Sequence, residues 1–292
     1  MQGEPVNIDQ PLLTVIVLTR DEAIHLSRLV ASFNGVSCRF VVVDSGSTDG
    51  TEELARKLGA EVHQHPFENH ARQFNWALDT LTIETPWTMR MDADEYLLPG
   101  LADELAKVLP TAPADVGGWM IRRRVYFWGR WIRHGGYYPT WLLRIWRTGT
   151  ARLESRYMDE HVILKKGNVR KLKGDIVDEN LKGLGFWTEK HNKYADREVL
   201  DLMSELSGSG AEPAGQAGLR RKLKLSVYAR MPLFFRAWVY WFYRYVVRLG
   251  FWDGKPGFVF HFLQGFWYRF LIDAKLYEAR MRLIDRPKSP KN

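Results

Sequence analysis

Two carboxylates separated by one residue, Asp92 and Asp94, follow a short apolar segment, residues 87–91, that we expect to be a β-strand. Carboxylates at positions i and i+2 directly after a strand can share a hard cation, because Mg²⁺ and Mn²⁺ take oxygen ligands and keep part of their coordination for phosphate oxygens. A cation between these side chains and a diphosphate would stabilise the charge that grows on a leaving phosphate. The triplet also occurs in solvated turns, so its weight comes from its place at a strand end.

A third carboxylate, Asp44, ends another apolar segment, residues 40–43, and begins a loop rich in Ser, Gly and Thr. Such a side chain can accept a hydrogen bond from a base N–H or a ribose hydroxyl, or it can form an Asx turn that leads into a helix. We favour the first role for Asp44. Arg72 and Asn75 lie one helical turn apart and face one way, where Arg72 can meet a phosphate or a base or belong only to a polar surface.

A second group of candidate side chains is Asp159, Glu160 and His161. Either carboxylate can act as a general base that takes the proton of an attacking hydroxyl, and the spacing does not distinguish the two. His161 can be a third metal ligand or an ordinary hydrogen-bonded histidine.

Short apolar strands alternate with helical segments in the first third of the chain. We expect helices at 21–33, 50–58 and 69–80, and strands at 12–18, 40–43, 61–65 and 87–91. This alternation predicts an α/β fold with a mostly parallel central sheet flanked by helices. Because ligands bind beyond the carboxyl ends of such strands, Asp44 and Asp92 should share one edge. Residues 117–146 should add strands and loops, and 189–206 a helix.

The C-terminal part of the chain differs in composition. A segment poor in apolar bulk, 207–218, predicts a flexible linker between a catalytic domain at 1–206 and a helical region at 219–292. The whole chain of 292 residues has a formal net charge of +8, and residues 213–252 contain eight Lys or Arg and no Asp or Glu.

Those basic residues are interleaved with aromatic ones, a pattern that predicts helices lying in a membrane interface and meeting an anionic membrane surface. The apolar runs are shorter than the roughly 18 uncharged residues that a spanning helix needs. A buried helical subdomain with surface arginines and a short re-entrant hairpin around 253–257 are the alternatives. The stretch is too apolar for a nucleic-acid-binding arm, so we expect no nucleic acid partner.

The expected location is cytoplasmic, peripheral on the membrane. The single cysteine, Cys38, excludes a disulfide framework within the chain, which suits a reducing compartment. Residues 1–10 lack a basic region followed by an apolar run, so no signal peptide is predicted.

Four ordered segments resemble family 2 glycosyltransferases and are most similar to the branch that includes lipopolysaccharide-core β-glucosyltransferases. They are LTVIVLTRDE at 13–22, VVVDSGSTDGT at 41–51, ARQFNWA at 71–77 and MDADE at 91–95. The resemblance covers residues 12–200. It implies a GT-A (Rossmann-like) fold, a nucleotide-sugar donor, a divalent cation and inversion at the anomeric carbon.

The resemblance also implies a set of site residues. It assigns nucleotide-sugar binding to Thr19, Arg20, Glu22, Asp44, Arg72, Asn75 and Asp92. Asp92 and Asp94 match the family motif that holds Mg²⁺ or Mn²⁺ and the diphosphate. The segment with Asp159 and Glu160 resembles the part that supplies the base, but this chain reads Asp-Glu-His where many relatives read His-Glu, so the identity of the base stays open.

The sequence therefore predicts a metal-dependent inverting hexosyltransferase that moves a single sugar from a nucleotide-diphosphate donor, expected to be a UDP-sugar. The expected acceptor is lipid-linked or a glycolipid of cell-envelope polysaccharide or lipopolysaccharide synthesis. The Gln-X-X-Arg-Trp motif of processive relatives is not apparent. Two other functions compete: a sugar nucleotidyltransferase, whose Gly-rich opening loop is missing at residues 19–23, and a non-enzymatic membrane-surface or nucleic-acid-binding module, which the charge permits.

Overall fold

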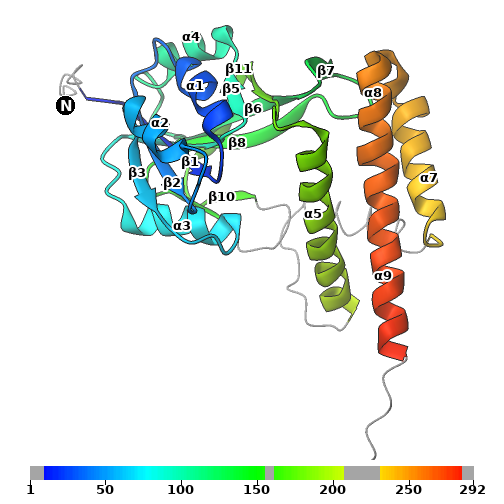
Figure 1. The fold of residues 1–292 in the computed structure, drawn as a ribbon. Coiled ribbons are helices and arrows are strands. Elements are labelled where there is room, and N and C mark those ends of the chain that lie inside the picture. The colour runs from blue at the N-terminus through cyan, green and yellow to red at the C-terminus, as the bar shows by residue number, and fades with distance from the viewer. Residues whose placement is uncertain (1–9, 155–160, 207–230, 285–292) are drawn as a thin grey trace, which may run out of the picture. The chain divides into compact units, whose positions relative to one another are not determined.

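The structure, a computed structural model, describes residues 10–154, 161–206 and 231–284. Its contacts divide the chain into two compact units (Figure 1). The first consists of Met1–Trp131 and Tyr137–Leu181, and the second of Ile132–Gly136 and Lys182–Asn292. The predicted linker at 207–218 lies outside the described residues. Helix α5 (Gly183–Leu206), which we had expected in the catalytic domain, groups with the C-terminal helices instead.

A mixed sheet, nine-stranded within the described residues, forms the first unit. Its strand order is β3-β2-β1-β4-β8-β6-β11-β5, and β7 pairs with β6. The bounds are β1 (Leu13–Thr19), β2 (Cys38–Asp44), β3 (Glu61–Gln64), β4 (Trp87–Asp92), β5 (Glu95–Leu97), β6 (Val116–Phe127), β7 (Arg130–Ile132), β8 (Thr140–Arg147) and β11 (Asn168–Asp178). The short strands β9 (Ala151–Leu153) and β10 (Val162–Leu164) pair separately.

Helices cover both faces of the N-terminal half of this sheet, which explains the apolar, β-branched sequences of β1 and β2. Leu26 and Leu29 of α1 (Ala23–Ala31) belong to the core on one face, which α2 (Thr51–Lys57) and α4 (Pro99–Val108) complete. Phe74 and Ala77 of α3 (His70–Thr80) belong to the core on the other face. The predicted α/β fold, a central sheet flanked by helices, is confirmed, and antiparallel β8 makes the sheet mixed.

The carboxyl ends of β1, β2 and β4 meet at one edge, as predicted. In the register, Thr19 is the partner of Asp44, and Leu18 is the partner of Asp92. Because neighbouring strands lie about 4.8 Å apart, the two acidic strand ends are roughly 10 Å apart across β1. Strands β6 and β11 also end at this edge, since antiparallel β8 stands between β4 and β6.

The second unit is helical. Besides α5, it contains α7 (Phe235–Phe242), η1 (Tyr243–Val247), η2 (Gly250–Asp253), α8 (Gly254–His261), η3 (Phe262–Trp267) and α9 (Tyr268–Ile284). Ala195 and Val199 of α5 pack against Ile272 and Leu276 of α9. The predicted helical, aromatic C-terminal region is thus present, and no helix in the described part of the chain is both long and apolar enough to cross a membrane.

A buried ion pair and hydrogen bonds to a buried carboxylate link segments of the second unit. Arg236 and Asp273 pair in its interior. The carboxylate of Asp253 accepts hydrogen bonds from the backbone N–H of His134 at 3.0 Å and from His134 Nδ1 at 2.6 Å. This explains why residues 132–136, which begin at the last residue of β7, group with the helices.

Candidate active site

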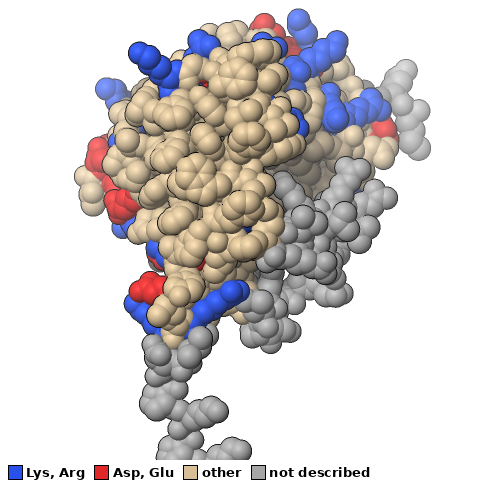
Figure 2. Space-filling model, turned by 90° about the vertical axis from the view of Figure 1, so that its right-hand side faces the viewer, with Lys and Arg blue, Asp and Glu red and all other residues tan. Residues whose placement is uncertain are grey.

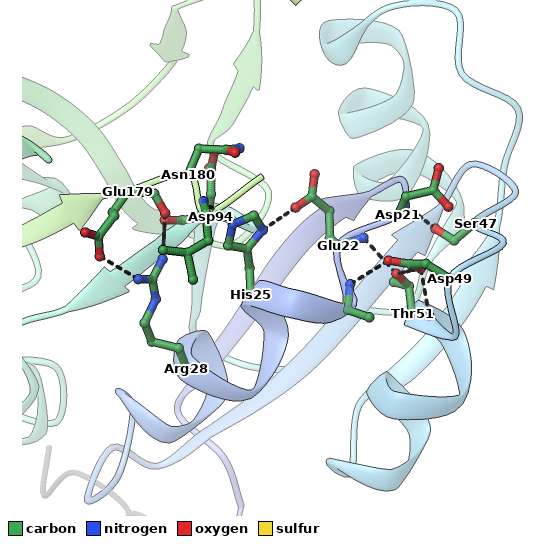
Figure 3. Close-up of polar contacts among 12 residues, drawn as sticks. Asp21, Glu22, His25, Arg28, Ser47, Asp49, Thr51, Asp94, Glu179 and Asn180 are labelled. Carbon is green, nitrogen blue, oxygen red and sulfur yellow. Dashed lines mark hydrogen bonds and ion pairs between the residues drawn. The ribbon is translucent and has the colours of Figure 1, made fainter. Parts of the chain in front are cut away.

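The loops that follow β1 and β2 are joined by hydrogen bonds, several of which are drawn in Figure 3. Asp21 Oδ1 accepts from the N–H of Thr48 at 2.7 Å, and the N–H of Asp21 donates to Ser47 Oγ at 2.7 Å. The N–H of Glu22 donates to Thr51 Oγ1 at 2.8 Å. Asp21 has a φ of 54°, a left-handed conformation that Asp tolerates better than most residues. The two loops therefore form one ordered surface beside the strand ends.

Asp44 lies under this surface, fully buried. Its Oδ2 accepts from Thr19 Oγ1 at 2.7 Å and from Ser47 Oγ at 2.5 Å, and its Oδ1 accepts from the N–H groups of Gly46 at 2.9 Å and Ser47 at 2.7 Å. Burial would raise the pKa of Asp44, but these bonds outweigh it and lower that pKa. A carboxylate has about four lone-pair sites, so Asp44 here forms the turn after β2, and contact with a base would require the exchange of one of these bonds.

Glu22 and Arg20 lie on the first of the two loops, where Arg20 is exposed. The ring of His25 links Glu22 to the segment after β11, since Nε2 accepts from the N–H of Leu181 at 2.9 Å and Nδ1 lies 2.6 Å from Glu22 Oε2. Because Nε2 is the acceptor, the proton is on Nδ1, which donates to Glu22. The fully buried His25 therefore couples the loop after β1 to the segment after β11.

The two predicted residues of α3 differ in role. The Arg72 side chain is 64% exposed and contacts Glu68. Asn75 is half-buried, and its Nδ2 donates to Leu153 O at 2.9 Å while its Oδ1 accepts from Leu153 N–H at 3.0 Å. Asn75 thus fixes β9, which leads into residues 155–160. Those residues lie outside the described part, so the predicted base, Asp159 or Glu160, stays a prediction.

Asp92 and Asp94 flank the tight turn between β4 and β5. Asp92 Oδ2 accepts from Arg144 Nη2 at 3.1 Å, yet the Asp92 side chain remains 40% exposed. Desolvation would raise the pKa of Asp92, but the positive charges of Arg144 and Arg90 outweigh it and hold that pKa well below its usual range. Asp94 Oδ2 accepts from Asn180 Nδ2 at 3.0 Å, and Oδ1 has no partner among the described residues.

These carboxylates fit a hard divalent cation, because their oxygens are the donors that Mg²⁺ and Mn²⁺ take. Three or more His, Cys, Asp or Glu side chains do not gather into a metal site anywhere in the described residues. His161, exposed just before β10, is therefore not brought to the pair. A cation at Asp94 and Asp92 would take its remaining ligands from phosphate and water.

A buried ion pair beside the turn was not expected from the sequence. Arg144 of β8 contacts Glu95, whose Oε2 accepts from the N–H of Asp92 at 3.0 Å. Burial and the charge of Asp92 raise the pKa of Glu95, and Arg144 opposes that rise. The available signal was Arg144 itself, because a charge within the apolar run 142–146 requires a buried partner.

The segment after β11 was also missed, and Figure 3 shows how it fastens α1 to the turn. Arg28 Nη1 donates to Glu179 Oε2 at 2.6 Å, and Arg28 Nη2 donates to Glu179 O at 2.6 Å. The N–H of Glu179 in turn donates to Asp94 O at 3.1 Å. Together with Asn180, these contacts fix the backbone and the carboxylate of Asp94.

Comparison with known proteins agrees with this geometry. Residues 14–181 match the family model described as glycosyl transferase family 2. The curated protein "Lipopolysaccharide core biosynthesis glycosyltransferase LpsC" of Rhizobium meliloti (strain 1021) is 29% identical over 289 residues, 95% of this chain and 95% of LpsC. An uncharacterized glycosyltransferase of Rickettsia conorii is 31% identical over 103 residues, which span 35% of this chain and 36% of that protein.

Solved structures give weaker likenesses. The mannosyltransferase PcManGT from Pyrobaculum calidifontis, in complex with GDP-Man and Mn²⁺, has 15% identity and a TM-score of 0.46, covering 96% of this chain and 89% of that one. Residues 1–349 of S. aureus TarS, in complex with UDP-GlcNAc, have 14% identity and a TM-score of 0.45, covering 94% and 93%.

Proposed function

Since the chain belongs to glycosyl transferase family 2, we propose that it is an inverting, metal-dependent enzyme that transfers one sugar from a nucleotide-diphosphate donor to a lipid-linked or glycolipid acceptor. The observation that carries this proposal is the Asp92–Asp94 turn at the carboxyl end of β4, on the same sheet edge as Asp44. Family membership favours it over the nucleotidyltransferase and the non-enzymatic module.

The donor, a UDP-sugar, binds over the carboxyl ends of β1, β2 and β4. The joined loops after β1 and β2 support its nucleotide, with Thr19, Arg20 and Glu22 nearby and Arg72 and Asn75 on its flank. Asp94, with Asp92 beside it, holds Mg²⁺ or Mn²⁺. When bound, the cation stabilises the charge that develops on the leaving diphosphate.

The acceptor hydroxyl loses its proton to Asp159 or Glu160 and attacks the anomeric carbon from the face opposite the diphosphate. The bond from that carbon to the diphosphate oxygen breaks as the new glycosidic bond forms. Asn75 supports this step by fixing β9, which precedes the segment that carries the base.

The second unit supports an acceptor held in a membrane. Residues 231–277 contain two carboxylates, Asp253 and Asp273, and both are buried. Figure 2, in which the helical unit faces the viewer, shows a broad area free of acidic and basic side chains. We call the following exposed side chains the apolar face: Phe235, Trp238, Val239, Phe242, Tyr243, Val246, Val247, Leu249, Phe251, Trp252, Phe258, Phe262 and Phe270.

A face of this kind suits the headgroup boundary of an anionic membrane, where rings lie at interfacial depth. Exposed cations such as Arg248 and Lys255 would meet anionic lipid. LpsC acts in lipopolysaccharide core biosynthesis, as its name states, and we extend this process to the chain. The acceptor is then a glycolipid of lipopolysaccharide core synthesis, reached from the cytoplasmic face of the membrane.

The decisive test uses two single variants, Asp94→Ala and Asp92→Asn. We expect sugar transfer to fall by at least about 100-fold, because charge stabilisation at the leaving group is a large share of catalysis, while the melting temperature without ligand changes little. A thermal-shift panel of nucleotides and nucleotide-sugars, with and without Mn²⁺, reports donor and metal binding together.

The matched control is Asp79→Asn, which removes an exposed carboxylate of α3 that pairs with Arg152. It should leave transfer unchanged. Near-normal turnover of both turn variants with every donor tested would remove the metal assignment.

A further inference from the structure

A group of cationic and aromatic side chains lies on neighbouring strands β6, β8 and β11 and on β7, which pairs with β6. Within it, Arg122 is the register partner of both Trp141 and Asp175. Because Ile121 and Ile176 point into the core, Arg122 and Asp175 point to the opposite face of the sheet. We call the following residues the Arg122 cluster: Arg122, Arg124, Trp131, Trp141, Lys171 and Asp175.

The cluster lies toward the carboxyl ends of β6 and β11. These ends share an edge with β4, whose last residue is Asp92. Further along β11, Asp178 is the partner of Glu95, the residue that follows the Asp92–Asp94 turn. The cluster is therefore on the sheet edge where transfer is proposed to occur, on the side of the turn away from β2.

A buried carboxylate orients the two arginines. The Asp175 side chain is 1% exposed; its Oδ1 lies 2.7 Å from Arg122 Nε, and its Oδ2 accepts from Arg124 Nε at 2.6 Å. The guanidinium of Arg122 also donates to Lys173 O. Because a guanidinium has five N–H donors, contacts through Nε leave others for a second acceptor.

The cluster carries more positive than negative charge. Within the described residues, Asp175 is the one carboxylate that both arginines contact, and a single arginine would neutralise it. The side chains of Arg122 and Arg124 are 29% and 26% exposed, and Lys171 is exposed. An anion from solution can therefore reach these cations.

Aromatic rings stand beside each cation. The Arg124 Cζ lies 4.2 Å from the centre of the Trp131 ring, and the Lys171 Nζ lies 4.7 Å from that of Trp141. The Arg122 Cζ is 5.5 Å from the Trp141 ring. Rings offer an apolar surface to the C–H face of a sugar, while guanidinium and ammonium groups bind carboxylate or phosphate.

We propose that the Arg122 cluster binds an anionic sugar of the acceptor, with Arg122, Arg124 and Lys171 on its carboxylate or phosphate and Trp141 against its ring. This inference rests on the proposed function, since it names the class of acceptor. The cluster selects a negatively charged saccharide and holds it beside the donor edge.

Binding to the purified full chain is measured with three probes of one size: glucose 6-phosphate, glucuronate and glucose. Tryptophan fluorescence and ligand-observed NMR report affinity. We expect at least one anionic probe to bind about tenfold more tightly than glucose, equivalent to ~1.4 kcal/mol. The tighter anion identifies the acceptor group as phosphate or carboxylate. Equal binding of glucose would overturn the proposal, and inorganic phosphate binding as tightly as glucose 6-phosphate would overturn its saccharide part.

Lys171→Gln and Arg122→Gln should each lower the affinity for the anionic probe about tenfold. Lys171 is exposed, so its variant remains informative if loss of Arg122 impairs folding. Arg170→Gln is the matched control, because Arg170 lies next to Lys171 on β11 but pairs with Asp115 and is not part of the cluster. A Lys171→Gln protein that binds the probes as wild type does would overturn the assignment.

The enzyme assay separates this inference from the proposed function. With acceptor, Lys171→Gln should raise the acceptor KM about tenfold and change kcat little, and the UDP-plus-Mn²⁺ thermal shift should equal that of wild type. A changed kcat at unchanged acceptor KM would count against the cluster. A wild-type protein that responds to no nucleotide would defeat the proposed function, while the anion probes would still report on the cluster.

Discussion

The carboxylate of Asp94 is oriented by a hydrogen bond from a residue that is distant in the sequence, Asn180. Asn180 Nδ2 donates to Asp94 Oδ2 at 3.0 Å, and Oδ1 has no partner among the described residues. Outer-shell contacts of this kind orient ligating carboxylates and affect metal affinity. Asn180 is therefore a positioning residue for the proposed cation.

We expect Asn180→Ala to lower the affinity for Mn²⁺ about tenfold, in line with the usual effect of losing an outer-shell partner. Saturating Mn²⁺ should restore most of kcat, which simple misfolding would not permit. The measurement is transfer rate against Mn²⁺ concentration. Asn168→Ala removes a comparable Asn–Asp contact, to Asp115 on the surface, and should leave the curve unmoved. An unchanged half-saturating Mn²⁺ in Asn180→Ala would rule out the positioning role.

Arg144 balances two carboxylates at the turn, Asp92 and Glu95. It is 4% exposed and Glu95 is 1% exposed, so neither has water as a substitute partner. Replacing Arg144 by Met should destabilise the fold by about 3 kcal/mol, because removal of one member of a buried pair leaves the other buried without its partner. Urea unfolding gives the free energy.

The control for that experiment is Arg152→Met. Arg152 pairs with Asp79 on the surface, both about half exposed, and such pairs contribute roughly 0–1 kcal/mol. Equal losses in the two variants would show that the Arg144 pair does not hold the turn.

Residue types and strand ends were readable from the sequence, but their partners were not. Asp92 and Asp94 sit at a strand end, as predicted, because an apolar strand precedes them. Arg144 and Asn180 reach that turn from 52 and 86 residues away. Such pairings depend on which strands become neighbours, and no local pattern encodes that.

At the scale of elements, the alternating strands and helices of residues 12–92 followed from their local periodicity. The position of β8 between β4 and β6 did not, because antiparallel insertion depends on long-range pairing. Helix α5 was predicted from residue 189 but begins at Gly183. Its first turns contain Phe186 and Trp187, whose burial depends on tertiary contacts such as that of Trp187 with Trp267.

Helix α5 also carries a histidine that the fold keeps neutral. His191 stacks on Trp187 with ring centres 3.6 Å apart and bonds to Trp187 O through Nδ1 at 2.8 Å. Burial, with a smaller contribution from the charge of Lys190, lowers the pKa of His191 to about 4. The unfolded chain binds this proton near pH 6.5.

Between these two values the unfolded state holds more protons than the native state, so stability falls as the pH decreases from about 6.5 toward 4. We expect a loss on the order of 2 kcal/mol over that window. His191→Gln should flatten this part of the curve of unfolding free energy against pH. His63→Gln, which changes a partly exposed histidine of β3, is the control substitution. A slope that survives in His191→Gln would assign the pH dependence to other groups.

At the scale of the whole molecule, acidic and basic side chains of the second unit occupy different places: within residues 231–277 the carboxylates are buried, and basic side chains such as Arg248 and Lys255 are exposed. Asp273 pairs with Arg236 inside, and Asp253 binds His134 and His261. The surface of residues 231–277 is thereby left without a carboxylate. Composition predicted the aromatic and basic content, but only the fold reveals that both acids are internal.

Because this surface lacks carboxylates, we expect that adding one to the apolar face will weaken membrane binding. Trp238→Glu and Phe242→Glu, at side chains 51% and 54% exposed, place a carboxylate on the apolar face. Each variant lacks a ring that would enter the membrane interface, and its new carboxylate is repelled by anionic lipid. Partitioning of the protein onto the vesicles should therefore weaken at least about tenfold. Sedimentation with vesicles of phosphatidylcholine and phosphatidylglycerol measures it.

Leu200→Glu is the matched control, since Leu200 of α5 is 65% exposed and lies outside the apolar face. The second arm uses vesicles of phosphatidylcholine alone, where wild-type binding should be weaker and less sensitive to salt, because counter-charge from the lipid is missing. If all three variants sediment as the wild type does, the face is not a membrane contact. If all three lose binding alike, the loss reflects added charge anywhere on the second unit rather than contact through the apolar face.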